Sequence, residues 1–265
     1  MHKDKEVLKA ALTASFGTDS PLCEAHRCSQ ATHQGLAEIP LDSFADHAHL
    51  IYSLDFSNNV LQSVPADFFG FFPSLSSLAL SHNQLQTLPP GIGKCASLVF
   101  LDLSSNEISS LPDDFANVMK SLRVLILSSN PLFSLPACVL SSTALQELYA
   151  NQTGLEELPD VFPEHSELAT LHLADNAICQ LPPSFTNLTQ VVDLDLMGVK
   201  WIEFQDAKVS ITSDAFLAFT SANPLLDRID KKVCICIFFV SFTSVGILHV
   251  LAIQYFSSCR LVGLK

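Results

Sequence analysis

The sequence predicts an α/β solenoid, in which short repeats stack so that their parallel strands form a concave sheet and short helical or irregular limbs form the convex side. Two observations predict it. A leucine recurs at intervals of 23 or 24 residues, and the residues around each of these leucines follow one pattern. Because a single unit cannot bury its own apolar edge, several units must stack to make one continuous core. The repeats span residues 34–202, and the recurring leucines are Leu54, Leu78, Leu101, Leu125, Leu148, Leu171 and Leu194.

The third unit shows the pattern most clearly. It reads Leu98-x-x-Leu101-x-Leu103-x-x-Asn106-x-Ile108-x-x-Leu111-Pro112. Leu101 and Leu103 are two residues apart, so both side chains point to the same side of a short strand. We therefore expect each unit to contribute one strand to the sheet and two leucines to the core.

An asparagine follows the strand in most units and is expected to turn the chain away from the sheet. Its amide side chain both donates and accepts hydrogen bonds, so it suits backbone groups that the turn leaves unpaired in its own unit and in the neighbouring one. Thr153 takes this place in the fifth unit, and Val199 in the seventh unit ends the series. The predicted asparagine ladder is Asn59, Asn83, Asn106, Asn130 and Asn176.

The outer limb of each unit begins at a proline, which fixes φ. Three residues later comes a large apolar side chain that we expect to face the core. These residues are Phe68, Ile92, Phe115, Val139, Phe162 and Phe185. They account for much of the phenylalanine content without a ligand pocket.

This unit resembles the intracellular leucine-rich repeats that carry a Leu-Pro pair near the end of the unit. Such repeats occur in Ras-suppressor-like scaffold proteins and in the repeat segments of Roco-type GTPases and kinases. The resemblance covers residues 34–202 and implies protein–protein recognition on the concave face. It is specific for the fold and much less so for function, since one fold hosts many functions.

The two ends of the solenoid are expected to be capped. Residues 1–33 form an N-terminal cap region, with a helix around Glu6–Ala14. Residues 203–232 form a C-terminal cap and linker, with a helix near Ser213–Ser221 whose first turn Thr212 or Ser213 would cap.

The segment 233–256 differs in character from the repeats, because its 24 residues include no Asp, Glu, Lys or Arg. As a helix it would be about 36 Å long, enough to cross a bilayer core. Basic residues precede and follow it, and the positive-inside rule slightly favours repeats that face the cytosol. The sequence therefore predicts a transmembrane helix that acts as a tail anchor. Two alternatives stay open: the segment is buried against a further domain, or it is read-through past a gene-model boundary.

Composition limits the class of partner and the compartment. The formal net charge is −13, and no basic stripe is visible, which disfavours nucleic acid as a main partner. The eight cysteines are scattered, and no apolar run follows Met1, so we expect a reducing, cytoplasmic location.

No motif for catalysis, a cofactor or a metal is present. Gly91-Ile92-Gly93-Lys94 fails as a phosphate loop, because Leu88 stands where a glycine is needed and Cys95 follows the lysine. Cys23, His26, Cys28 and His33 have a spacing that matches no common zinc site. The sequence therefore predicts a non-enzymatic protein without a cofactor.

The strand positions beside the inward leucines point out of the concave face. In the middle units these positions carry apolar side chains, and acidic side chains flank them. This is a common arrangement in a protein interface. We predict that they bind a partner protein whose surface is basic and apolar, although packing against a terminal extension is the alternative. The predicted site is Phe100, Asp102, Val124, Ile126, Glu147, Tyr149, His172, Asp193 and Asp195.

Three function classes follow. The first is a protein-interaction scaffold or signalling regulator anchored to a membrane with its repeats in the cytosol. The second is the repeat fragment of a larger Roco-type signalling enzyme. The third is a receptor ectodomain, which glycosylation at the acceptor patterns of Asn151 or Asn187 would favour.

Overall fold

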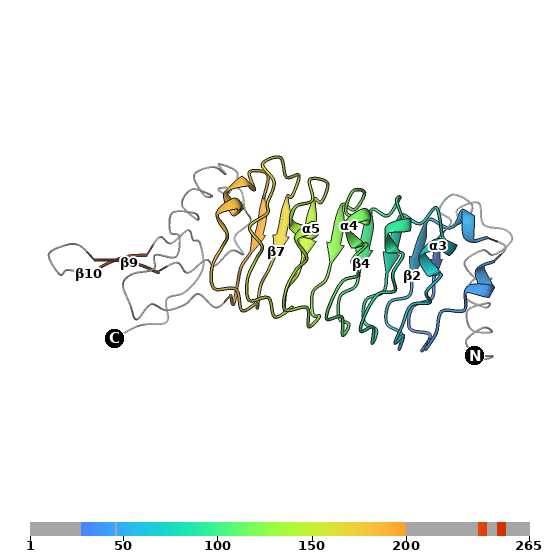
Figure 1. The fold of residues 1–265 in the computed structure, drawn as a ribbon. Coiled ribbons are helices and arrows are strands. Elements are labelled where there is room, and N and C mark those ends of the chain that lie inside the picture. The colour runs from blue at the N-terminus through green and yellow to red at the C-terminus, as the bar shows by residue number, and fades with distance from the viewer. Residues whose placement is uncertain (1–27, 46, 200–237, 243–247, 253–265) are drawn as a thin grey trace.

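The computed structural model describes residues 28–45, 47–199, 238–242 and 248–252. Eight strands in these ranges form one parallel sheet in sequence order, and the units lie side by side along one axis (Figure 1). Each strand has three residues. They are β1 (Cys28–Gln30), β2 (Ser53–Asp55), β3 (Ser77–Ala79), β4 (Phe100–Asp102), β5 (Val124–Ile126), β6 (Glu147–Tyr149), β7 (Thr170–His172) and β8 (Asp193–Asp195).

The register of the sheet places equivalent residues of successive units opposite one another. Leu54 pairs with Leu78, Leu78 with Leu101, and the series continues to Leu194. From β2 to β8 the central leucine of each strand is buried and its neighbours are more exposed. The predicted solenoid with a parallel sheet is therefore confirmed.

The other side of the units is built from short helices and loops. Four-residue α-helices form α3 (Phe68–Phe71), α4 (Phe115–Val118) and α5 (Ala137–Leu140). Short 3₁₀ turns take this place elsewhere: η1 (Leu41–Phe44), η2 (Ala48–Leu50), η3 (Ile92–Lys94) and η4 (Pro183–Asn187). All six predicted outer-limb residues are buried, none more than 3% exposed, so they do face the core.

The asparagine ladder is present as predicted. Asn106 Nδ2 donates to Leu103 O in its own unit and to Leu80 O in the unit before, each at 2.9 Å, while its Oδ1 accepts the N–H of Leu85 at 3.0 Å. Asn83 and Asn130 make the same set of bonds. Each unit that carries a ladder asparagine is therefore joined to its predecessor through buried side-chain hydrogen bonds, whereas Thr153 in the fifth unit bonds within its own unit and to the sixth.

The residue before each ladder position has a left-handed backbone conformation that the sequence analysis did not anticipate. Its φ lies between 54° and 59° at His33, Asn58, His82, Ser105, Ser129, Gln152 and Asp175. In the seventh unit Gly198 takes this place with φ 69°. All seven are polar and none is β-branched, and Asn, Asp and His in particular adopt this conformation more often than other residues with a side chain.

Strand β1 lies on the N-terminal side of residue 34, where the sequence analysis placed the start of the repeats. Ser29 pairs with Leu54, so it occupies the place of the leucine that anchors the other units. The missing leucine explains why the repeat pattern did not reveal this strand.

The predicted apolar C-terminal helix is wrong for the residues that the structure describes. Two strands, β9 (Phe238–Phe242) and β10 (Leu248–Ala252), pair antiparallel within the segment 233–256. Phenylalanine and valine favour strands, and Gly246 stands between the two runs, which weakens a continuous helix. Among the described residues no helix is both long and apolar enough to cross a bilayer. The predicted helices at Glu6–Ala14 and Ser213–Ser221 lie outside the described residues.

Candidate functional site

The sheet face that points away from the core, predicted to be concave, is called the open face here. Three rows of side chains cross it, one from each outward position of a unit. The first row is Ser53, Ser77, Phe100, Val124, Glu147, Thr170 and Asp193. The second is Asp55, Ala79, Asp102, Ile126, Tyr149, His172 and Asp195, and the third is Ser57, Ser81, Ser104, Ser128, Asn151, Ala174 and Met197.

All nine predicted site residues lie in the first two rows, on β4 to β8. The register places Phe100 beside Val124, and Asp102 beside Ile126. Eight of the nine are half-buried, while Asp193 is exposed. The structure thus brings them together on one face, as sequence spacing requires.

The apolar centre of the open face consists of Phe100, Val124, Ile126 and Tyr149. These residues belong to three neighbouring strands and two neighbouring rows. Val99, directly before β4, is also an exposed apolar residue, with 42% of its side chain accessible. The sequence analysis did not select Val99, because it considered only the strand positions between the two inward leucines and directly beside them.

The acidic part of the site is held by side-chain contacts. The Tyr149 hydroxyl donates to Glu147 Oε2 at 2.9 Å, and the Tyr149 ring meets His172 edge to face with centroids 4.9 Å apart. His172 Nε2 lies 3.0 Å from Asp193 Oδ2. Partial burial, with the hydrogen bond to Glu147 next in importance, raises the pKa of Tyr149 to about 12. The phenol is therefore a neutral hydrogen-bond donor at physiological pH.

Three aspartates of the second row share a different arrangement. Oδ1 of Asp55, Asp102 and Asp195 accepts the backbone N–H two residues further on, at 2.9 to 3.0 Å. Asp102 also accepts the hydroxyl of Ser104 at 2.7 Å. These bonds fix the direction of each carboxylate on the open face.

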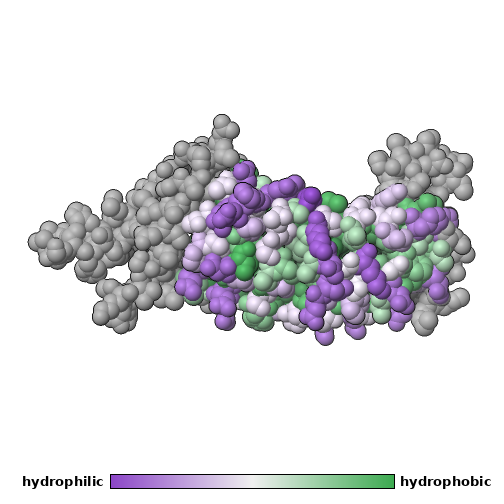
Figure 2. Space-filling model, turned by 45° about the horizontal axis from the view of Figure 1, so that its top comes forward, coloured by the Kyte–Doolittle hydropathy of each residue, from purple (hydrophilic) through white to green (hydrophobic). Residues whose placement is uncertain are grey.

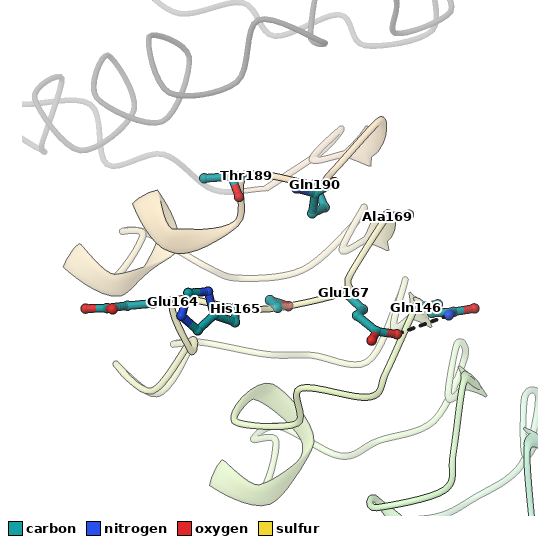
Figure 3. A pocket seen from close by; sticks show the side chains of 8 residues that line it. Gln146, Glu164, His165, Glu167, Ala169, Thr189 and Gln190 are labelled. Carbon is teal, nitrogen blue, oxygen red and sulfur yellow. Dashed lines mark hydrogen bonds between the residues drawn. The ribbon is translucent and has the colours of Figure 1, made fainter.

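Other parts of the described surface offer weaker sites. Figure 3 shows an open pocket that includes Glu164, His165, Glu167 and Gln146, where Gln146 Nε2 donates to Glu167 Oε2 at 3.2 Å. It is wide open to solvent and its lining is mainly polar. In the view of Figure 2, hydrophilic and hydrophobic residues are interspersed over the repeats.

Phe133, 60% exposed with φ 58°, is the most exposed large apolar side chain among the described residues, and it was not predicted.

The rejected motifs have ordinary structural roles where the structure describes them. Asp114 Oδ2 accepts the N–H groups of Gly91 and Gly93 at 2.7 and 3.2 Å, so a carboxylate of the chain occupies this loop. Cys95 is fully buried, and desolvation raises the pKa of its thiol to about 11. Within the described ranges no three His, Cys, Asp or Glu side chains are grouped to hold a metal ion.

Both glycosylation acceptor asparagines are engaged in the fold. Asn151 Oδ1 accepts the N–H of Ala174 at 2.7 Å, and Asn187 Nδ2 donates to Phe162 O at 2.8 Å. Thr153, the third residue of the first acceptor pattern, is 1% exposed. A glycan is attached through Nδ2, so of these two bonds only the one from Asn187 to Phe162 O involves the atom that would carry it.

Comparison with known proteins agrees with the repeat architecture. Residues 49–108 match the family model described as leucine rich repeat. No curated protein was found to match the sequence. Residues 49–108 thus match the leucine-rich repeat pattern, while the comparisons do not distinguish the Ras-suppressor or Roco type of repeat from others.

Several solved structures are similar to this chain. The TLR13–ssRNA13 complex is 29% identical, with a TM-score of 0.52 over 62% of this chain and 24% of that one. The leucine-rich repeat domain of APL1B is 25% identical, with a TM-score of 0.56 over 80% and 62%. The LRIM1/APL1C complex, 24% identical with a TM-score of 0.55 over 65% and 35%, supports the fold alone. The chain covers less than two thirds of the length of each of these three.

Proposed function

We propose that this chain is a non-catalytic protein-interaction module that binds a partner protein on the open face. The observation that carries the proposal is the cluster of Phe100, Val124, Ile126 and Tyr149 on a sheet face, with Asp and Glu around it. Burying such a cluster releases water from apolar surface, and the charged rim supplies orientation. An interface is commonly organised in this way.

Charge specifies the kind of partner. Residues 28–199 contain eighteen Asp and Glu but only three Lys and Arg. None of the three cations belongs to the rows of the open face, and Arg123 donates from Nη1 to Ala144 O at 2.8 Å. A negative face repels phosphate and attracts Lys and Arg, so a protein with a basic surface fits it better than a nucleic acid.

The similar structures are consistent with this proposal without deciding it. One is a complex of two proteins, LRIM1 and APL1C, and another is a complex of TLR13 with ssRNA13. The acidic open face favours the first kind of partner for this chain. Leucine-rich-repeat domains serve widely as interaction modules, which also supports a function without catalysis.

Site-specific photo-crosslinking in the full chain tests the proposal. A benzophenone side chain at position 126 or 149 should form adducts with the same protein, because both positions lie on the open face. A benzophenone at Ala116, which is exposed on α4 of the outer limb, is the matched control. Ile126→Asp and Tyr149→Ala should lower the affinity for the captured protein. Equal adducts from position 116, or unchanged affinity in both variants, would contradict binding on the open face.

A cytosolic location, membrane attachment through residues 233–256 and origin from a larger Roco-type enzyme stay predictions. Carbonate extraction and protease protection of the full chain and of a version ending at Asp230 test the first two. Membrane attachment predicts that only the full chain resists extraction, and a cytosolic location predicts that protease reaches the repeats. A longer transcript continuing from about Asp230 would support the larger enzyme.

A further inference from the structure

We propose that the partner contacts the open face with an amphipathic helix that lies across the strands, with apolar residues in its middle and Lys or Arg near both ends. This inference rests on the proposed function and specifies the partner class. The apolar stripe of the helix would cover Ile126 and Tyr149. Its basic ends would meet Asp102 on β4 and Asp195 on β8.

The spacing of the units favours a helix over an extended segment. Neighbouring strands lie about 4.8 Å apart, while one turn of an α-helix advances about 5.4 Å. Successive turns of a helix can therefore contact successive units, with one side chain per unit from positions i, i+4, i+7 and so on. Asp102 and Asp195 are four strands apart in the register, which is roughly 19 Å, or about 13 residues of helix. Lys and Arg at positions i and i+14 lie on one helix face and have side chains long enough to reach both carboxylates.

The contacts within the open face indicate which carboxylates are available to the partner. Glu147 already accepts the Tyr149 hydroxyl, and Asp193 lies against His172. Oδ1 of Asp102 accepts the backbone N–H and the hydroxyl of Ser104, and Oδ1 of Asp195 accepts the N–H of Met197. These bonds use only one oxygen of each carboxylate. A carboxylate held in one direction loses little conformational freedom when it meets a cation.

The shape of the rows leaves room for a helix. The second row is bulky at Ile126, Tyr149 and His172, while the third row beside it is small from Ser57 through Ala174, except for Asn151. Rows are about 6.6 Å apart along a strand, and a helix is about 10 Å wide. A helix body can thus rest over the small third row with its apolar side against the second row.

The test uses the full chain and two synthetic helical peptides of equal composition, each about 18 residues long. The matched peptide carries Lys at i and i+14, with Leu at i+4 and i+11 and Phe at i+7. The permuted peptide has its two Lys on the opposite helix face. Binding is measured by fluorescence anisotropy with wild type, Asp102→Asn, Asp195→Asn and Ile126→Asp. Glu164→Gln, which removes one exposed charge away from the open face, is the control.

The matched peptide should bind about tenfold more tightly than the permuted one. Asp102→Asn and Asp195→Asn should each weaken it about two- to fivefold, the effect of one exposed ion pair. Ile126→Asp should abolish binding, and Glu164→Gln should leave it unchanged. Equal binding of the two peptides, no binding of either, or an equal effect of Glu164→Gln would overturn the helix proposal. If crosslinks from position 126 still captured a partner in that case, the proposed function would stand and only the partner class would be wrong; without such crosslinks, both fail.

Discussion

Removing one rung of the asparagine ladder should destabilise the solenoid far more than a single exposed hydrogen bond would. Asn106→Ala deletes the bonds from Nδ2 to Leu80 O and Leu103 O and the bond from Leu85 N to Oδ1. The N–H of Leu85 then loses its partner, while Leu80 O and Leu103 O keep one donor each, Nδ2 of Asn83 and Nδ2 of Asn130. At about 1–3 kcal/mol for the unsatisfied N–H and about 0.5–1.5 kcal/mol for each of the two lost hydrogen bonds, we expect a loss of about 2–5 kcal/mol. Such a loss is a large part of the total stability of a typical domain, about 5–15 kcal/mol.

Urea unfolding followed by circular dichroism measures this loss, with Asn187→Ala as the matched control. Asn187 is half-buried and donates one hydrogen bond, to Phe162 O at 2.8 Å, so its replacement should cost about 1 kcal/mol. Asn106 lies between the second and third units, so the variant should also weaken coupling along the stack and lower the cooperativity of unfolding. A loss for Asn106→Ala no larger than that for Asn187→Ala would refute the view that the ladder holds the units together.

Three further predictions concern the core, a turn and the open face. Phe115→Ala should cost about 3–5 kcal/mol in urea unfolding, because the ring is fully buried and leaves a cavity; a loss below about 1 kcal/mol, the range of a surface substitution, would contradict the outer-limb assignment. Gly154→Ala should cost about 1–2 kcal/mol, because φ is 74° and the new methyl would lie 3.0 Å from the Phe133 ring, and Phe133→Ala should relieve part of that cost. The pKa of Tyr149 is about 12 in the folded chain and about 10 in the unfolded chain, so between these pH values the unfolded chain loses the phenol proton first. The free energy of unfolding should therefore fall as the pH rises from about 10 to about 12. Tyr149→Phe should remove that part of the pH dependence in urea titrations.

The parts of the fold that could be predicted from the sequence are those that recur in every unit. Leu54 and its counterparts define the strands, and Asn59 and its counterparts define the turns, because each residue type solves the same local problem in every unit. Even the exception at Thr153 followed from the chemistry of its side chain. Its Oγ1 lies 2.9 Å from Ala150 O, within the unit, and 3.0 Å from Asn176 Oδ1 in the next unit.

Prediction from the sequence was wrong or incomplete where the residues depart from the repeat pattern. Strand β1 was not predicted, because Ser29 stands where the other units have a leucine. The strand pairs with β2 through backbone groups, which do not require a leucine. In the segment 233–256 apolar content alone predicted a helix, whereas β9 and β10 pair through backbone groups that composition does not reveal. The nine candidate site residues were located correctly on one face, but the contacts among Glu147, Tyr149, His172 and Asp193 depend on neighbouring strands and required the structure.

The ladder also gives the solenoid a direction. Each asparagine rung reaches back to the unit before it, as when Asn176 Oδ1 accepts the N–H groups of Thr153 and Leu155. Val199 has no side-chain oxygen with which to do this for Ile178, the counterpart of Leu155 in the sixth unit. Deuterium uptake in amide exchange should therefore begin at Ile178 and spread toward the N-terminal units as successive rungs open. The units should therefore exchange their amide hydrogens in order from the C-terminal end of the stack, and slow exchange should begin at Asn176, the last complete rung of the ladder.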